Sequence, residues 1–101
     1  MKIQEIPLTP DNQQFSIALG SQNLGIRVIW RDDAGWILDL LDSSERELIS
    51  GIPMVCGVDL LAQYSFLGIE GQLIVKNDDD DNEYPTKENL GIRSHLYFVQ
   101  S

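Results

Sequence analysis

Apolar and polar residues alternate along much of the chain, the pattern of β-strands that bury one face and expose the other. Odd positions are apolar in residues 15–19, and even positions are apolar in residues 24–30 and 36–40. Segments rich in Gly, Asn and Asp separate these runs, at residues 20–23 and 32–35. Because such residues tolerate the backbone angles of tight turns, the pattern predicts a three-stranded antiparallel meander over residues 13–42.

Four shorter runs predict further strands outside the meander. Residues 2–8 fit an edge strand, residues 47–52 a strand that ends at Pro53, and residues 73–75 and 95–99 two more. Proline ends a strand because it has no N–H to donate to the neighbouring strand. Short strands at close spacing predict an all-β fold, a small barrel or sandwich of about seven mostly antiparallel strands.

One segment departs from the alternation and has the spacing of a helix instead. Between residues 58 and 67 the large apolar side chains recur three and four positions apart: Leu60, Leu61, Tyr64 and Leu67. Asp59 is a candidate N-cap, and Gly68 follows the last apolar position. We expect a single short helix, or a helical turn, that lies over an open end of the sheet.

Length and composition favour one small globular domain over residues 1–101. A chain of 101 residues with 43% hydrophobic residues has enough apolar side chains for one core, and no linker interrupts it. No apolar run follows Lys2, and none is long enough to cross a bilayer, so we expect neither a signal peptide nor a membrane span. Cys56 is the only cysteine, which excludes an internal disulfide and points to synthesis in a reducing cytoplasm.

The charge of the chain argues against a surface that binds nucleic acid. The net charge is −9, from 16 acidic and 7 basic residues, whereas phosphate backbones are bound through Lys and Arg. The acid is concentrated between Asn77 and Glu88, where six carboxylates accompany Lys87 alone. A block of like charges repels itself and stays in solvent, so we interpret residues 77–88 as an acidic mobile loop on a nearly neutral body.

Two other interpretations of this acidic loop remain open. Oxygen-bearing side chains occupy positions 1, 3, 5 and 12 of the stretch, as in an EF-hand calcium loop: Asn77, Asp79, Asp81 and Glu88. Position 6, however, is Asn82 where that loop needs glycine, and position 9 is Pro85, so the solvated loop is favoured. The first alternative is a small calcium-dependent binding module. The second is a decoy that imitates DNA, which would need acidic residues spread along an extended face.

Groups that could carry catalysis or bind a cofactor are scarce. His95 is the only histidine and lies in an apolar strand, and Cys56 has no basic residue near it in the sequence. A nucleophile needs a partnered base, and zinc usually takes several His or Cys ligands. The sequence lacks the glycine-rich phosphate loop, the Gly-x-Ser-x-Gly motif and the Cys-x-x-Cys motif. We expect no enzyme, no cofactor, and no catalytic, cofactor-binding or metal-binding residue.

Two tryptophans, Trp30 and Trp36, flank the turn at residues 32–35. Both continue the apolar faces of adjacent predicted strands, so packing in the core is the favoured interpretation. In the alternative, the tip of the hairpin presents them to a partner as interface anchors.

Several strings of residues are similar to those of a known family, and together they span nearly the whole chain in the family's order. They are residues 3–8 (IQEIPL), 14–17 (QFSI), 30–40 (WRDDAGWILDL), 51–55 (GIPMV), 57–64 (GVDLLAQY), 67–69 (LGI), 89–91 (NLG) and 96–99 (LYFV). In these strings the chain resembles the baseplate plug family of contractile-tailed phages and prophages. The family supplies no residue-level functional site, and none is carried over to this chain.

The resemblance implies a non-enzymatic, β-rich structural protein of a contractile tail baseplate. It implies a plug on the tail axis near the hub and spike, at the distal end of the tail tube, which it helps to close until contraction. The implied partners are other baseplate proteins, namely the hub, the spike and the end of the tail tube, with several copies around the axis and no membrane contact. Assembly is expected in the cytoplasm of the bacterial host, and the final location is the virion tail baseplate.

Overall fold

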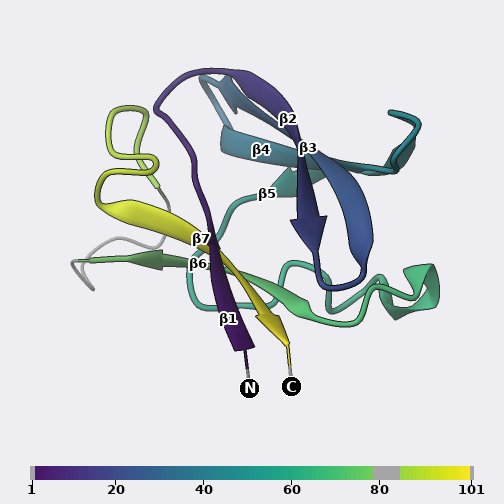
Figure 1. The fold of residues 1–101 in the computed structure, drawn as a ribbon. Coiled ribbons are helices and arrows are strands. Elements are labelled where there is room, and N and C mark those ends of the chain that lie inside the picture. Colours follow the sequence, from purple (N-terminus) through teal and green to yellow (C-terminus); the bar gives the residue numbers. More distant parts are fainter. Residues whose placement is uncertain (1, 79–84, 101) are drawn as a thin grey trace.

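The computed structural model describes residues 2–78 and 85–100, and seven strands of this part form two antiparallel sheets. The four-stranded sheet has the order β2-β3-β4-β5 and contains β2 (Gln13–Leu19), β3 (Gln22–Arg31), β4 (Gly35–Leu41) and β5 (Glu47–Pro53). The three-stranded sheet has the order β1-β7-β6 and contains β1 (Lys2–Ile6), β7 (Ser94–Gln100) and β6 (Gln72–Asn77). The predicted all-β fold is confirmed. The described strands form a sandwich-like arrangement and not a closed barrel (Figure 1).

The predicted meander is the antiparallel run β2–β3–β4, whose strands pair in sequence order. Both connections depend on a glycine with positive φ: Gly20 (φ 64°) in the first turn and Gly35 (φ 78°) at the end of the second. A non-glycine residue is strained at such angles, and this is why the turn residues could be recognised in the sequence. The alternation predicted there is also observed, because Leu24, Ile26 and Val28 of β3 all point into the core.

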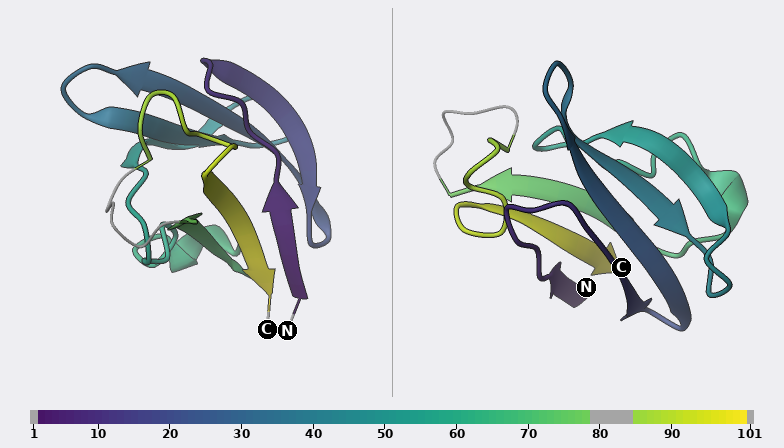
Figure 2. Two further views of the ribbon diagram at one scale, coloured as in Figure 1. Left: turned by 90° about the vertical axis from the view of Figure 1, so that its left-hand side faces the viewer. Right: turned by 90° about the horizontal axis from the view of Figure 1, so that it is seen from above.

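The second sheet is built from the strands at the two ends of the chain and from one strand that precedes the C-terminal strand in the sequence. Strands β1 and β7 pair from Lys2 opposite Gln100 to Ile6 opposite Leu96, so the two ends of the chain lie side by side (Figure 2). Strand β6 pairs with the other side of β7. The prediction that the N-terminal segment is an edge strand is therefore confirmed.

The core lies between the two sheets and is closed by side chains from the loops. Side chains that are almost inaccessible come from both sheets and from the segments between them: Ile6, Ile26, Val28, Leu38, Leu40, Met54, Leu73, Val75, Leu90, Leu96 and Phe98. Each strand of the three-stranded sheet except the N-terminal one contributes alternate positions, as in Leu96 and Phe98 of β7. One inward face on each sheet is what a two-layer β fold requires.

Of the two forms predicted for residues 58–67, the short helix is not observed, whereas a helical turn is present. The segment contains hydrogen-bonded turns and a single 3₁₀ turn at Ser65–Leu67. Its first part is held against the edge of β6, where the amide of Leu60 donates to the carbonyl oxygen of Leu73 at 2.8 Å. Asp59, the predicted N-cap, accepts hydrogen bonds from the amides of Leu61 (2.9 Å) and Leu73 (3.1 Å). Asp59 thus caps a turn and ties it to a strand.

Candidate functional site: the outer faces of the two sheets

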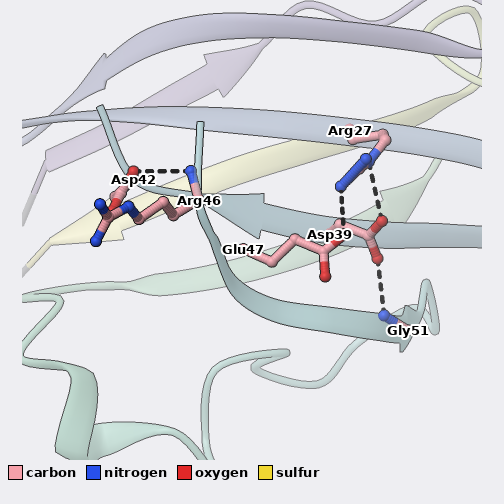
Figure 3. Close-up of polar contacts among 6 residues, drawn as sticks. All are labelled: Arg27, Asp39, Asp42, Arg46, Glu47 and Gly51. Atoms are coloured by element: carbon pink, nitrogen blue, oxygen red, sulfur yellow. Dashed lines mark hydrogen bonds and ion pairs between the residues drawn. The ribbon is translucent and has the colours of Figure 1, made fainter. Parts of the chain in front are cut away.

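The outer face of the four-stranded sheet carries a closed network of charged side chains (Figure 3). Arg27 of β3 donates from Nε to Asp39 of β4 at 3.0 Å and from Nη2 to Glu47 of β5 at 2.7 Å. The other carboxylate oxygen of Asp39 accepts the amide N–H of Gly51 at 2.8 Å. The network spans three neighbouring strands and satisfies Arg27 and Asp39 within the sheet, so it has the character of a structural ion-pair cluster.

The free edge of this sheet, β5, is irregular. Its register against β4 shifts twice, between Leu38 and Leu40 and again between Leu40 and Leu41, as β-bulges do. Gly51 lies at the first shift with a φ of 79°, and its amide is the one that Asp39 binds. Bulges, the charged Glu47 and the terminal Pro53 are features that prevent a further strand from pairing with an edge.

The β6 edge of the three-stranded sheet is covered, and the β1 and β2 edges are linked by a side-chain contact. The β6 edge is covered by the segment that follows β5, through hydrogen bonds from Gly57 N to Val75 O (2.9 Å) and from Leu60 N to Leu73 O (2.8 Å). Between β1 and β2, the side-chain Nε2 of Gln4 donates to the carbonyl oxygen of Ala18 at 3.1 Å and links the two sheets. Contacts with another protein are therefore expected through the faces of the sheets.

The outer face of the three-stranded sheet carries a group of neighbouring apolar side chains, whereas an ion-pair network lies on the outer face of the larger sheet. Four apolar side chains from its three strands line a shallow depression of about 450 Å³, together with Gln72 and Lys76: Ile3, Ile74, Tyr97 and Val99. Ile3 is 60% exposed. An antiparallel sheet with one face in solvent normally places polar residues there. This apolar outer face, defined by those six residues, is the most distinctive surface of the described chain.

His95 lies on the same side of β7 and links three elements. Its Nδ1 is 2.9 Å from a carboxylate oxygen of Glu5 in β1, and its Nε2 is 3.2 Å from one of Asp78, just after β6. Burial acts to lower the pKa of His95, but the hydrogen bonds and negative charges of Glu5 and Asp78 outweigh it and raise the pKa. Two carboxylates on one imidazole hold a proton in place. The sequence did not indicate these two carboxylate partners, and the structural role of His95 stays a prediction.

Cys56 is half-buried next to the edge of β6, where it pairs with Val75 in an isolated bridge. Burial raises the pKa of the Cys56 thiol, and a hydrogen bond with the backbone of Asn77 only partly opposes this effect. The thiolate is the reactive form of cysteine, so a raised pKa keeps the side chain unreactive at neutral pH.

The two tryptophans pair across the β3–β4 hairpin, with ring centroids 5.3 Å apart in an edge-to-face arrangement. Trp36 is 2% exposed, so the predicted core position is confirmed for this residue. Its Nε1–H donates to the carbonyl oxygen of Thr86 at 2.8 Å. Trp30 is only partly buried, and its Nε1–H donates to Asp32 at 2.9 Å. Trp30 lines an open depression of about 820 Å³ between the hairpin tip, the end of β5 and residues 85–87.

The predicted acidic loop is described only at its two ends. Its first residue, Asn77, accepts a hydrogen bond from the hydroxyl of Ser94, and Asp78 faces His95. Glu88 is exposed, whereas the candidate calcium ligands Asp79 and Asp81 lie outside the described residues. Within residues 2–78 and 85–100, no three His, Cys, Asp or Glu side chains are grouped as a metal site would require. Nor does this part of the chain contain a helix long and apolar enough to span a membrane.

Comparison with known proteins gives the family. No curated protein shows significant similarity to the chain. One family model, described as cyanophage baseplate Pam3 plug gp18, matches residues 3–101. This match covers both sheets, including the paired ends β1 and β7 that complete the fold. The chain therefore belongs to the cyanophage baseplate plug family, in agreement with the resemblance of its sequence strings.

Proposed function

We propose that the chain is a plug that sits on the tail axis near the hub and spike and helps to close the end of the tail tube. Its family makes it a structural component of a phage baseplate. The observation that carries the proposal is the extent of that match, residues 3–101. A match over the whole fold, rather than over one segment, supports a role like that of the family's plug. The proposed partners are the hub, the spike and the end of the tail tube, with several copies around the axis.

The described residues support a role without catalysis. The charges of the Arg27 cluster are satisfied by one another, and the imidazole of His95 is held by two carboxylates. A catalytic site needs titratable groups that face a bound substrate in a pocket. The described clusters instead join neighbouring strands, which suits a protein whose task is to keep its shape and bind other subunits. We therefore propose a non-enzymatic protein that is assembled in the host cytoplasm.

The position of the chain can be tested directly. The full chain is co-expressed with the hub, spike and tail-tube subunits of the same phage, and the assembly is purified through a tag on the hub and imaged by electron cryo-microscopy. We expect density for the chain on the axis at the distal end of the tube. A chain that never co-purifies, or that lies on the periphery of the baseplate, would contradict the proposal.

The acidic loop is expected to contribute little to this assembly. Replacing Asp78–Asp81 with Ser and Gly should leave the fold intact, because adjacent like charges repel one another. The loss of Asp78, which lies 3.2 Å from His95, should lower the free energy of unfolding by no more than about 1 kcal/mol. Exposed charges are screened within about 8 Å at physiological ionic strength, so they contribute little to binding. Binding to the hub should therefore survive both this replacement and high salt. Replacing Asp32 and Asp33 of the β3–β4 turn serves as the control. A complex that dissolves in salt and is lost only in the loop variant would instead make the acidic residues the contact.

A further inference from the structure

The two outer faces of the sandwich differ in a way that indicates which one binds a partner. On the four-stranded sheet, the outward positions include Arg27, Asp39 and Glu47, joined in one ion-pair network. On the three-stranded sheet, four of the outward positions are apolar and line the apolar outer face with Gln72 and Lys76, while Glu5 and His95 lie beside them on the same side. Leaving apolar side chains in water costs free energy roughly in proportion to their area. Contiguous exposed apolar patches on small proteins mark sites of interaction.

The pairing of the strands places the apolar side chains next to one another. Ile3 of β1 lies opposite Val99 of β7, and Ile74 of β6 lies opposite Tyr97 of β7. Neighbouring strands are about 4.8 Å apart, so these side chains form a continuous surface rather than scattered exposed residues. The β6 edge of this sheet is covered by the segment that follows β5, so a chain that approaches the β6 side meets the face rather than a free strand edge.

The charges around the face specify the chemistry of the partner. Glu5 and Asp78 are both engaged by His95. Lys76 is exposed at the β6 side of the face, and it forms no ion pair with another residue of the described part of the chain. A partner that covers the face would desolvate this ammonium group, which is unfavourable unless a carboxylate faces it. The partner therefore needs an apolar surface with an acidic side chain opposite Lys76.

A second copy of the chain fits the face poorly. The three strands, six residues long in β6, cover roughly 300 Å², and a stable interface takes about 800 Å² from each partner, so this face alone would hold no single partner, a second copy included. Two copies would also each carry a net charge of −9 and repel one another. A small apolar contact is adequate when several contacts act together, as they do in a multi-subunit baseplate.

We infer that the apolar outer face of the β1–β7–β6 sheet is the surface by which the chain docks on another baseplate subunit, one that presents an apolar surface with a carboxylate opposite Lys76. This inference rests on the proposed function, because it requires the chain to be incorporated into a baseplate. It adds to that function the face that makes the contact and the chemistry of the surface that it meets.

The experiment compares matched variants in the co-expressed assembly of hub, spike and tail tube. Ile3→Asp places a charge on the face, and Ile92→Asp is its control, because the two isoleucines are 60% and 62% exposed and only Ile3 lies on the face. We expect Ile3→Asp to lower incorporation by about tenfold or more, the effect of losing one buried isoleucine, and Ile92→Asp to leave it unchanged. Lys76→Glu should lower incorporation by about fivefold, while Lys76→Arg retains it.

The outcomes test the docking face and the plug function separately. Thermal unfolding of the purified variants should match the wild-type protein, because the substituted side chains are exposed. Incorporation of Ile3→Asp at the wild-type level would overturn the docking face and leave the plug function standing. Failure of the wild-type chain to incorporate would overturn the plug function itself. Sedimentation of the chain alone should show a monomer, and a dimer that Ile3→Asp dissociates would assign the face to a second copy instead.

Discussion

Replacing Trp36 with alanine removes the buried indole that fixes the β3–β4 hairpin to the loop before β7. The side chain is 2% exposed, and such a truncation in a core costs about 3–5 kcal/mol of the free energy of unfolding. The carbonyl oxygen of Thr86 also loses its donor, which lies 2.8 Å away in the wild-type protein. Domains of this kind are stable by only about 5–15 kcal/mol, so the variant should be close to the limit of folding at room temperature.

Two milder substitutions divide this cost into its parts. Trp36→Phe keeps an aromatic ring in the core and loses the hydrogen bond to Thr86, so it should cost about 0.5–1.5 kcal/mol, the net contribution of one hydrogen bond. Trp30→Ala removes a partly buried ring and the edge-to-face contact, which is worth about 0.5–1.5 kcal/mol beyond the buried area. A double-mutant cycle over Trp30 and Trp36 should return a coupling energy of that size.

The measurement is urea unfolding monitored by circular dichroism, because every one of these substitutions removes a tryptophan and so alters the fluorescence. The midpoint should fall in the order wild type, Trp36→Phe, Trp36→Ala, with the slope m unchanged if only the folded state is affected. The reasoning would be refuted if Trp36→Ala kept the wild-type midpoint. If the same variant also failed to assemble into a baseplate, Trp36 would be an interface anchor, the alternative that its position beside the hairpin tip left open.

Three further substitutions test single contacts. Gly91→Ala should lower the free energy of unfolding by about 2 kcal/mol or more, because a Cβ there would overlap the carbonyl oxygen of Leu8 and φ is 80°; an unchanged melting temperature would contradict this. Asp39→Ala should cost about 0.5–1.5 kcal/mol in urea unfolding, because the Gly51 amide loses its hydrogen bond and Arg27 keeps only its ion pair with Glu47; a neutral result would mean that the bulge does not need Asp39. The pKa of His95 is raised in the folded protein, so its contribution to stability is complete below pH 6.5 and is lost as the pH rises through the raised value. The melting temperature of His95→Gln should lack this decline, and parallel pH profiles for the two proteins would refute the ion-pair role.

The strands could be predicted from the sequence because their information is local. In β2, β3 and β4 the alternation of apolar and polar residues agrees with the turn glycines, so two independent signals mark the same boundaries. The bulges of β5 could not be predicted in this way. They follow from the contact of Asp39 with Gly51, which joins residues of neighbouring strands across the loop between them.

Between residues 58 and 67 only the predicted helical turn formed, and the longer helix did not, for a physical reason. Spacing of apolar residues is a weak indicator in so short a segment, because a helix of about ten residues is barely stable without tertiary support. Here the tertiary contacts favour another conformation, since Leu60 and Asp59 both bind Leu73 of β6. The apolar residues Leu60 and Leu61 are buried as a helix face would be, but they reach the core from turns.

The proposed docking face illustrates a different limit, because no pattern within one strand identifies it. In β7 the residues Tyr97 and Val99 are as apolar as their inward neighbours Leu96 and Phe98, so the sequence of this strand does not tell which side faces solvent. The face exists because β1 and β6, far apart in the sequence, place apolar side chains beside those of β7. A catalytic site can often be recognised in a sequence by rare residue types. A docking surface is made of common residues that the pairing of strands brings together. For a structural protein of this kind, the strand order is therefore the first observation from which a binding surface can be argued.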